Sequence, residues 1–242
     1  MLSQDMKRFA ELLKKIPPVG WAMTVFLYGF ECLMYLLGPE LSMRTGTDSW
    51  AIAPKIPFID DNIPLVKVFV IIYVVSYAFW GIYLLIISTT DSRNYINFII
   101  SFMITSFIGF LFFLFMPTYI DRSAEGVLAA VEGPGFLNLC LRGIYASDGW
   151  ETGRSLFPSF HCFISMFCYL GVRRADNIGR GMKVFAIVAT VLVCLSTVFT
   201  KQHYFMDIVG GVGFAALCDA IVYKLDPGTR IVDKYFPGQD RF

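Results

Sequence analysis

Charged residues and histidine, which soluble proteins use freely, are scarce in this chain. Only 16% of its 242 residues are Asp, Glu, Lys or Arg, and only two are histidine. Soluble domains carry about 25% charged residues, so the composition excludes an ordinary soluble domain. The net charge of +1 excludes a strongly basic surface, and no nucleic-acid partner is expected. Hydrophobic residues make up 56% of the chain, which favours an integral membrane protein.

The cysteines form no disulfide or metal pattern. The chain has six, without a Cys-x-x-Cys pair or a Cys/His spacing typical of a metal site. Most of them fall in apolar segments, where a cysteine behaves as a small buried hydrophobic residue. We therefore expect no disulfide framework, no metal and no other cofactor.

Long apolar runs without alternation predict transmembrane helices. About 20 mainly apolar residues cross a bilayer as a helix, and the lack of alternation excludes a β-barrel. No clear cleavage site follows the first run, so we interpret it as an uncleaved span. We expect one integral membrane domain over residues 1–242, an all-α bundle of six transmembrane helices at roughly 18–38, 64–88, 95–117, 157–172, 184–200 and 204–224.

The placement of basic residues predicts the orientation of these spans. One side carries Lys7, Arg8, Lys14, Lys15, Arg93, Arg173, Arg174, Arg180, Lys183, Lys224, Arg230, Lys234 and Arg241. Short loops rich in Lys and Arg stay in the cytoplasm, so both termini are expected there. The outer loop 118–156 and both histidines then lie on the extracytoplasmic side. Within this loop, the segment GPGFLNLCLRGIY is expected to form a short interfacial helix.

The second histidine begins the last predicted span, in the stretch KQHYFMD. His203 and Asp207 are four residues apart, and such positions share a face on a helix. A carboxylate beside an imidazole fixes its tautomer and stabilises its charged form. A carboxylate within a membrane span is costly and is usually paired or functional. The pair is therefore either a catalytic couple or a structural bond between helices.

The first histidine lies in the stretch PSFHCF, at the start of the fourth predicted span. Pro158 suits the first turn of a helix, where its missing N–H costs nothing. The amides of Ser159, Phe160 and His161 would then be free donors at a helix N-terminus, which favours an anion. The alternative is an ordinary interfacial helix cap with an incidental histidine.

Six basic residues are expected on the same side as the two histidines, and three of them are candidates for the site, namely Arg122, Arg154 and Lys201. Each alone fits an interfacial cation that reaches toward lipid headgroups. An arginine also binds a phosphate through two parallel hydrogen bonds. Together with the helix N-terminus, these cations indicate a phosphate site at the membrane surface.

A histidine that is oriented by an aspartate and opposed by a second histidine suits phosphoryl transfer. One imidazole attacks phosphorus and forms a phosphohistidine. The other protonates the leaving oxygen and then deprotonates the incoming water or alcohol. Cations and amides stabilise the charge on the phosphoryl oxygens. A catalytic zinc ion needs three converging protein ligands, so this chemistry is expected to be independent of metal.

The stretch FPSFH, followed two spans later by STVFTKQHYFMDIVGG, resembles the type-2 phosphatidic acid phosphatase superfamily. That family has a Pro-Ser-x-His motif and a later Ser-Arg-x5-His-x3-Asp motif. The resemblance covers residues 95–215 and implies a six-helix membrane core with its site at one face. The sequence looks most like the branch of inositol phosphorylceramide synthases and bacterial homologues, which implies a bacterial plasma membrane.

The resemblance also implies roles for individual residues. His203 would be the nucleophile, Asp207 its orienting partner and His161 the general acid. The implied phosphate-binding residues are Arg122, Ser159 and Phe160.

Three positions depart from the family pattern. The first family motif is Lys-x6-Arg-Pro, and here Phe115 replaces its Lys and Ser123 its Pro. Thr197 replaces the Arg of the last motif. Because two expected cations are missing, we hypothesise that Lys201 or Arg154 replaces them in binding phosphate.

Three functions are compatible with these observations. The expected one is a phosphatase that hydrolyses a lipid phosphate or diphosphate at the outer leaflet, with the bilayer and its lipid as partners. The alternative is a headgroup phosphotransferase, similar to inositol phosphorylceramide or sphingomyelin synthases, which passes the group to an alcohol. A transporter is the third, because Glu31 lies within the first span and an acid there indicates a polar pathway.

Overall fold

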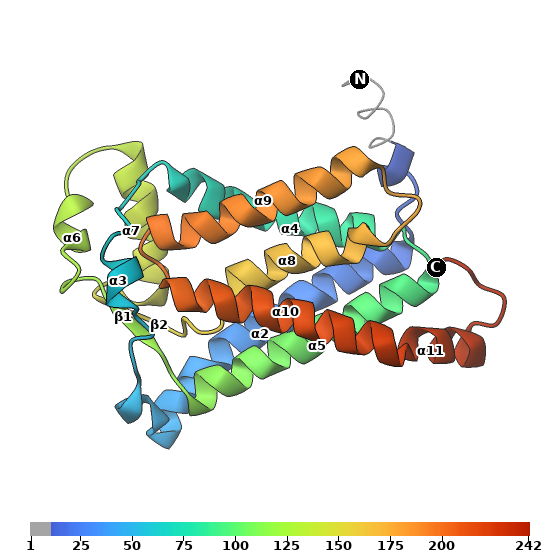
Figure 1. The fold of residues 1–242 in the computed structure, drawn as a ribbon, viewed down its shortest axis with the longest axis horizontal. Helices are drawn as coiled ribbons and strands as arrows, with labels where there is room; N and C mark the ends of the chain where they lie inside the picture. The colour runs from blue at the N-terminus through green and yellow to red at the C-terminus, as the bar shows by residue number, and fades with distance from the viewer. Residues whose placement is uncertain (1–10) are drawn as a thin grey trace.

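The computed structural model describes residues 11–242, most of which are α-helical (Figure 1). Six apolar helices run roughly alongside one another and form the bundle. They are α2 (Pro18–Thr45), α4 (Phe69–Ile87), α5 (Ser92–Phe115), α8 (Phe160–Arg173), α9 (Arg180–Phe199) and α10 (Phe205–Leu225). The expected all-α membrane bundle is therefore confirmed, while the basic residues Lys7 and Arg8 lie outside the described part of the chain.

Five of the six helices are long and apolar enough to cross a membrane, and α8 is the shorter one. Its 14 residues span about 21 Å at 1.5 Å per residue, less than the ~30 Å hydrocarbon core. However, α8 packs against α4, α5, α9 and α10, so neighbouring helices enclose it. A helix shielded by its neighbours need not match the bilayer thickness, because it does not meet lipid along its length.

The outward faces of the other helices carry large apolar side chains. Exposed examples are Trp21, Val25, Leu36, Ile71, Val75, Phe107, Phe185, Val188, Leu217 and Ile221. Exposed apolar surface on this scale indicates contact with lipid. The inward faces meet in an aromatic core, where Phe98 and Phe102 of α5 pack against Phe163 and Phe167 of α8.

The first membrane helix is longer than the predicted span of 18–38. α2 continues through Pro39 and ends at Thr45. Its end is set by Gly46, whose φ of 80° is the left-handed conformation that terminates helices and that glycine adopts without strain. The prediction stopped at the Gly-Pro pair, whereas the chain places its terminating glycine eight residues later than Gly38.

The connecting segments gather at one end of the bundle and form an outer cap (Figure 1). They comprise η1 (Thr47–Trp50), α3 (Pro57–Asp60), β1 (Tyr119–Asp121), α6 (Val127–Ala130), α7 (Phe136–Asp148) and β2 (Thr152–Arg154). Strands β1 and β2 pair antiparallel, and they close the outer loop 118–156 on itself. The helix expected in the segment GPGFLNLCLRGIY is present as α7, and its place at the membrane interface stays a prediction. The three-residue strands were not predicted, because they are too short to show alternation.

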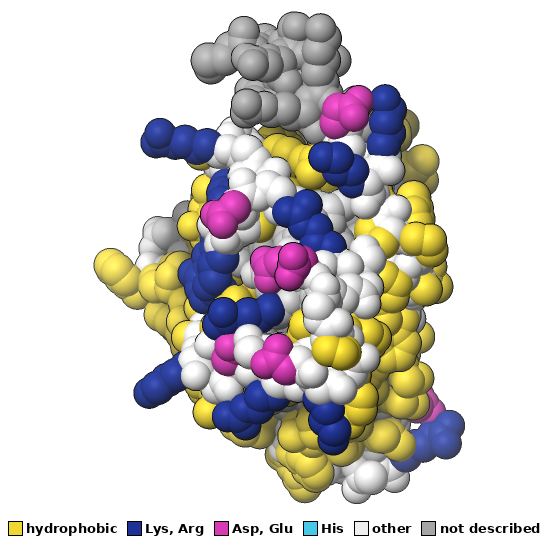
Figure 2. Space-filling model, turned by 90° about the vertical axis from the view of Figure 1, so that its right-hand side faces the viewer, with side chains coloured by type: hydrophobic (Ala, Val, Ile, Leu, Met, Phe, Trp, Pro, Cys, Tyr) yellow, Lys and Arg dark blue, Asp and Glu magenta, His cyan; other side chains and the backbone are white. Residues whose placement is uncertain are grey.

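Basic residues gather at the opposite end, where the last helix α11 (Pro227–Tyr235) lies (Figure 2). Here Asp219, which is almost fully buried, pairs with Arg173 and Arg174 at 2.6 and 2.8 Å. Figure 1 shows that the start of the described chain and its C-terminus both lie at this end of the bundle. A chain that crosses the membrane an even number of times has both of its ends on the same side. The cytoplasmic assignment of the basic end stays a prediction from the charge rule.

Candidate active site

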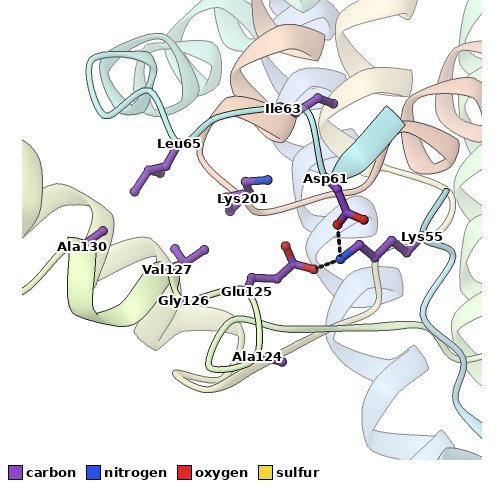
Figure 3. Close-up of a pocket in the computed structure, with 10 residues that line it drawn as sticks. All are labelled: Lys55, Asp61, Ile63, Leu65, Ala124, Glu125, Gly126, Val127, Ala130 and Lys201. Carbon is purple, nitrogen blue, oxygen red and sulfur yellow. Dashed lines mark hydrogen bonds and ion pairs between the residues drawn. The ribbon is translucent and has the colours of Figure 1, made fainter. Parts of the chain in front are cut away.

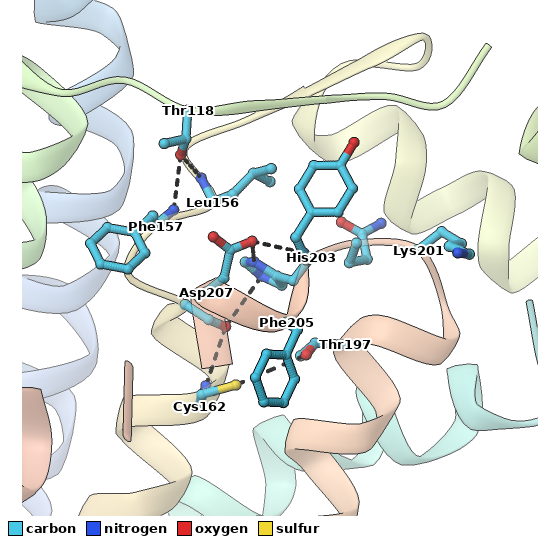
Figure 4. A network of polar contacts seen from close by, with 12 residues as sticks. Thr118, Leu156, Phe157, Cys162, Thr197, Lys201, His203, Phe205 and Asp207 are labelled. Carbon is cyan, nitrogen blue, oxygen red and sulfur yellow. Dashed lines mark hydrogen bonds and ion pairs between the residues drawn. The ribbon is translucent and has the colours of Figure 1, made fainter. Parts of the chain in front are cut away.

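His203 and Asp207 meet at the start of α10 (Figure 4). Nδ1 of His203 lies 3.3 Å from Oδ2 of Asp207, and the same oxygen accepts the backbone N–H of Tyr204 at 2.9 Å. Both side chains are buried. The expectation that the two residues share a helix face is wrong, because α10 begins only at Phe205. Their contact is made across the helix cap, where Asp207 in the first turn turns back toward the residues before the helix.

The start of α8 docks against this cap. Ser159 is the N-cap of α8 and its hydroxyl oxygen lies 3.3 Å from Nε2 of His203. The Ser159 N–H donates to the backbone carbonyl of Asp207 at 3.1 Å. The predicted free amide at Ser159 is therefore wrong, since Pro158 precedes the cap instead of occupying the first turn. Phe160 begins the helix, and its amide has no acceptor within the helix.

Two glycines of α10 make this docking possible. A Cβ on Gly211 would lie 2.5 Å from the carbonyl oxygen of Ser159, and one on Gly210 would lie 2.3 Å from the ring of Phe157. A larger residue at Gly211 would meet this backbone oxygen and push α10 away from the start of α8. Gly211 therefore sets how closely α10 approaches Ser159.

The fold brings the second histidine to the first. The ring centroids of His161 and His203 are 6.4 Å apart, although the residues are 42 positions apart in sequence. The ring of His161 stacks on Tyr73 at 4.1 Å and meets the edge of Trp80 at 4.9 Å. These aromatic contacts from α4 fix the orientation of the ring. Its Nε2 is buried and has no hydrogen-bond partner within residues 11–242.

Arg122 follows β1 and is fully buried beside the loop that carries His203. Its guanidinium donates to Asp148 Oδ2 at 2.7 Å, to the Gly149 carbonyl at 2.7 Å and to Gln202 Oε1 at 3.1 Å. It also lies 4.4 Å from the centre of the Tyr145 ring. Arg122 is thus held rigidly by the outer cap. Burial raises the pKa of the Asp148 carboxyl, and the positive charge of Arg122 only partly opposes this effect.

A cavity of about 350 Å³ opens beside His161, between α2, α4, α7 and α8. Its walls include His161, Gln202, Asp148 and Glu31. Each of these four residues has a buried polar atom without a hydrogen-bond partner in the described part of the chain. The atoms are His161 Nε2, Gln202 Nε2, Asp148 Oδ1 and Glu31 Oε1. Unpaired buried polar atoms are costly. Four residues that carry such atoms line one cavity of this size, which indicates a ligand site.

The sequence did not identify Gln202 and Asp148 as members of the site. Gln202 had a possible signal, since it directly precedes His203. Asp148 had none, because only the fold of the outer cap brings it to Arg122.

The other two predicted cations point elsewhere. Lys201 Nζ lies 3.3 Å from the carbonyl oxygen of Asp60, and Figure 4 shows its side chain directed away from the ring of His203. It lines a separate cavity of about 420 Å³ with Lys55, Asp61 and Glu125 (Figure 3). Arg154 is partly exposed and pairs with the carboxylate of Asp48 at 2.9 Å. The structure does not bring Lys201 or Arg154 to the histidines.

Neutral or apolar groups occupy the positions where the family pattern has other cations. Thr197 Oγ1 donates to the Cys194 carbonyl at 2.7 Å and lies 3.9 Å from the sulfur of Cys162. Phe115 is exposed at the end of α5. Residues 11–242 hold no cluster of three or more His, Cys, Asp and Glu side chains that could bind a metal ion.

The motifs of this site match a known protein family. The family model described as the PAP2 superfamily matches residues 50–221, well over half of the chain, and this segment contains both histidines, Asp207 and Arg122. No curated protein and no solved structure matches the chain significantly. The chain therefore belongs to the PAP2 superfamily, whose members are generally phosphatase-type enzymes.

Proposed function

We propose that the protein is a metal-independent phosphatase that hydrolyses lipid phosphates through a phosphohistidine. The pairing of its two histidines supports this most directly. His203 is bonded to Asp207 through one ring nitrogen. The ring centroid of His161 lies 6.4 Å from that of His203, and its Nε2 has no partner within residues 11–242. One imidazole is thus placed to attack and the other to transfer a proton. The site lies at the end of the bundle opposite the basic residues, which favours the extracytoplasmic leaflet.

In the first step, Nε2 of His203 attacks phosphorus while the bond from phosphorus to the lipid oxygen breaks. The proton on Nδ1 stays with the Asp207 hydrogen bond, which leaves the Nε2 lone pair free. His161 enters this step protonated and gives its proton to the departing lipid oxygen. In the second step, His161 removes a proton from water, whose oxygen attacks the phosphohistidine. Phosphate leaves and both imidazoles return to their starting states.

Neutral donors hold the phosphoryl oxygens, and Arg122 acts through one of them. The unpaired amide Nε2 of Gln202 is placed to donate to a phosphoryl oxygen in the cavity, and Arg122 supports it from behind through Oε1. The amides of Phe160 and His161 at the start of α8 add donors aimed along the helix axis. The hydroxyl of Ser159 lies beside the attacking nitrogen. These donors stabilise the charge that develops on phosphorus in the transition state.

Transfer to an alcohol is the second candidate. The charged cavity of Lys55, Asp61, Glu125 and Lys201 lies beside the loop that carries His203 (Figure 3). A polar alcohol bound there would compete with water for the phosphohistidine. The resemblance of the motifs to inositol phosphorylceramide synthases supports the same reaction.

Purified protein in detergent, given a panel of lipid phosphates with a chelator present, tests both candidates. Release of free phosphate supports hydrolysis, and a new phosphodiester in the presence of an added alcohol supports transfer. An acid-labile phosphoryl group trapped on the wild-type protein should be absent from His203→Ala. Activity that the chelator abolishes, or substantial turnover by His203→Ala, would contradict the mechanism.

A further inference from the structure

Glu31 is a buried acid that the proposed reaction does not use. It lies in the middle of α2 and is only 7% exposed. Its Oε2 accepts the hydroxyl of Ser106 on α5 at 2.6 Å, whereas Oε1 has no partner in the described part of the chain. A carboxyl group inside a membrane bundle is costly unless both oxygens are paired. Glu31 lines the same cavity as His161, so a ligand in that cavity is the nearest candidate partner for the free oxygen.

The cavity leads from His161 toward Glu31 along an aromatic wall. This wall consists of Tyr28, Tyr35, Tyr73, Tyr77 and Trp80. Tyr35 lies one helical turn, about 6 Å along the axis, on the outer side of Glu31. Its ring is 5.8 Å from that of Phe160, the residue next to His161. Glu31 is therefore placed inward of the phosphate end, at a depth where the first atoms of a lipid chain would lie.

The chemistry of Glu31 selects its partner. A phosphate oxygen cannot pair with a carboxylate, because both are hydrogen-bond acceptors of like charge. A hydroxyl group can pair with the carboxyl in either protonation state, since it both donates and accepts. Ester-rich and isoprenoid segments carry no hydrogen-bond donor for the ionised carboxylate. The apolar remainder of the lipid fits against the aromatic wall.

We propose that Glu31 binds a free hydroxyl group of the substrate, so that the preferred substrate is a lipid phosphate with a hydroxyl within a few bonds of its phosphate. This assignment rests on the proposed function of the site. It makes Glu31 a specificity-determining residue that separates hydroxylated lipid phosphates, such as lysophosphatidates and long-chain base phosphates, from fully esterified or polyprenyl phosphates.

Matched substrate pairs test the assignment. Lysophosphatidate is compared with its 2-deoxy analogue, and a long-chain base phosphate with its 3-deoxy analogue, which separates the glycerol from the sphingoid source of the hydroxyl. Loss of one hydrogen bond to a buried carboxyl costs about 1–3 kcal/mol, so wild-type kcat/KM should favour a hydroxylated member about 5- to 150-fold. Glu31→Leu should bring that ratio close to one, because it should lower kcat/KM only for the hydroxylated member of each pair. Glu31→Gln, which keeps an acceptor, should retain part of the preference.

A matched control comes from the same helix. Thr24 is also buried on α2, and its hydroxyl has no partner among residues 11–242, but it lies outside the residues that line the cavity. Thr24→Val should leave the substrate ratio unchanged. Equal wild-type rates on both members of both pairs would overturn the assignment, as would an equal loss on both members in Glu31→Leu.

Measured affinities for the matched substrate pairs test the role of Glu31 separately from the proposed reaction. If the wild-type protein turns over no lipid phosphate, the proposed reaction fails, but the affinities of the same matched pairs can still be measured. Tighter binding of a hydroxylated member by the wild type, and not by Glu31→Leu, supports the role of Glu31 by itself. Equal affinities in the two proteins contradict it.

Discussion

His203 contacts Asp207 across the beginning of a helix, with 3.3 Å between Nδ1 and Oδ2. The same aspartate oxygen accepts the N–H of Tyr204, so one carboxylate both caps α10 and orients the imidazole. Because the cap and the imidazole share one oxygen, the ring of His203 is fixed by the same carboxylate that caps the helix. The reactive face of the ring is thereby directed toward Ser159 and the start of α8.

Asp207→Asn is expected to separate these two roles. The asparagine oxygen can still cap the helix, but it no longer stabilises a charged imidazole, and its amide can favour the wrong tautomer. Turnover should fall about 10³- to 10⁴-fold, as is typical when the aspartate of such a couple is replaced, with little change in thermal stability. Asp207→Ala loses the cap as well and should also lower the unfolding temperature. Near-normal turnover by Asp207→Asn would assign the pair a structural role only.

Gly211→Ala should disrupt the site through the backbone. Its Cβ would meet the Ser159 carbonyl at 2.5 Å, so α10 and α8 must separate at the histidines. Overpacking of this kind costs about 1–3 kcal/mol, and turnover should fall with it. Gly213→Ala is the control, since nothing lies within 4 Å of its Cβ. There, alanine should stabilise the helix by about 0.5–1 kcal/mol. Equal behaviour of the two variants in thermal unfolding and turnover would contradict the packing argument.

Gln202 should matter more to turnover than the nearby cations Lys201 and Arg154. Both cations point away from the histidines, so Lys201→Ala and Arg154→Ala are each expected to keep kcat/KM within about threefold of wild type, the size of a weak surface effect. Gln202→Ala removes the free amide from the cavity and the acceptor from Arg122, and it should lower kcat/KM at least ~10-fold. A large loss in Lys201→Ala or Arg154→Ala would instead identify that residue as the substitute for a missing family cation.

The junction of α10 and α11 should weaken in acid. Partial desolvation raises the pKa of Asp226, but hydrogen bonds from Asn97, Thr229 and Arg93 outweigh it and lower the pKa from 3.8 to about 2. A lowered folded-state pKa means that the charged form stabilises the fold. That contribution is complete above about pH 4 and is lost as pH falls toward 2. Hydrogen exchange of the α11 amides, measured between these values, should report the loss.

Two variants of Asp226 refine this prediction. Asp226 has a left-handed backbone, with φ of 48°, and it caps α11. Asparagine tolerates this conformation and can still cap, so Asp226→Asn should remove the acid dependence at small cost. Asp226→Ala should cost about 1 kcal/mol through the lost cap. Unchanged acid dependence in Asp226→Asn would show that another group titrates.

Some parts of the site could be predicted because they depend on local patterns. The Pro-Ser-x-His and His-x3-Asp spacings identified both histidines and Asp207, and the apolar runs located the helices that carry them. The details at helix starts could not be predicted with the same success. Whether Ser159 is a cap or a first-turn donor depends on which carbonyl of α10 its amide meets, and that carbonyl belongs to a residue 48 positions away.

The sequence by itself determined that this chain is a helical membrane bundle with a paired-histidine motif, because apolar runs and motif spacings are local properties of the chain. Only the tertiary structure decided which polar groups share the cavity. Arg122 was a candidate beside Lys201 and Arg154, yet the pairing of β1 with β2 holds it near the histidines, while the other two bond elsewhere. Glu31 was an isolated acid in a span, and helix packing makes it part of the same cavity as His161. The physical reason is that a buried polar group is defined by its partners, and those partners come from distant parts of the chain.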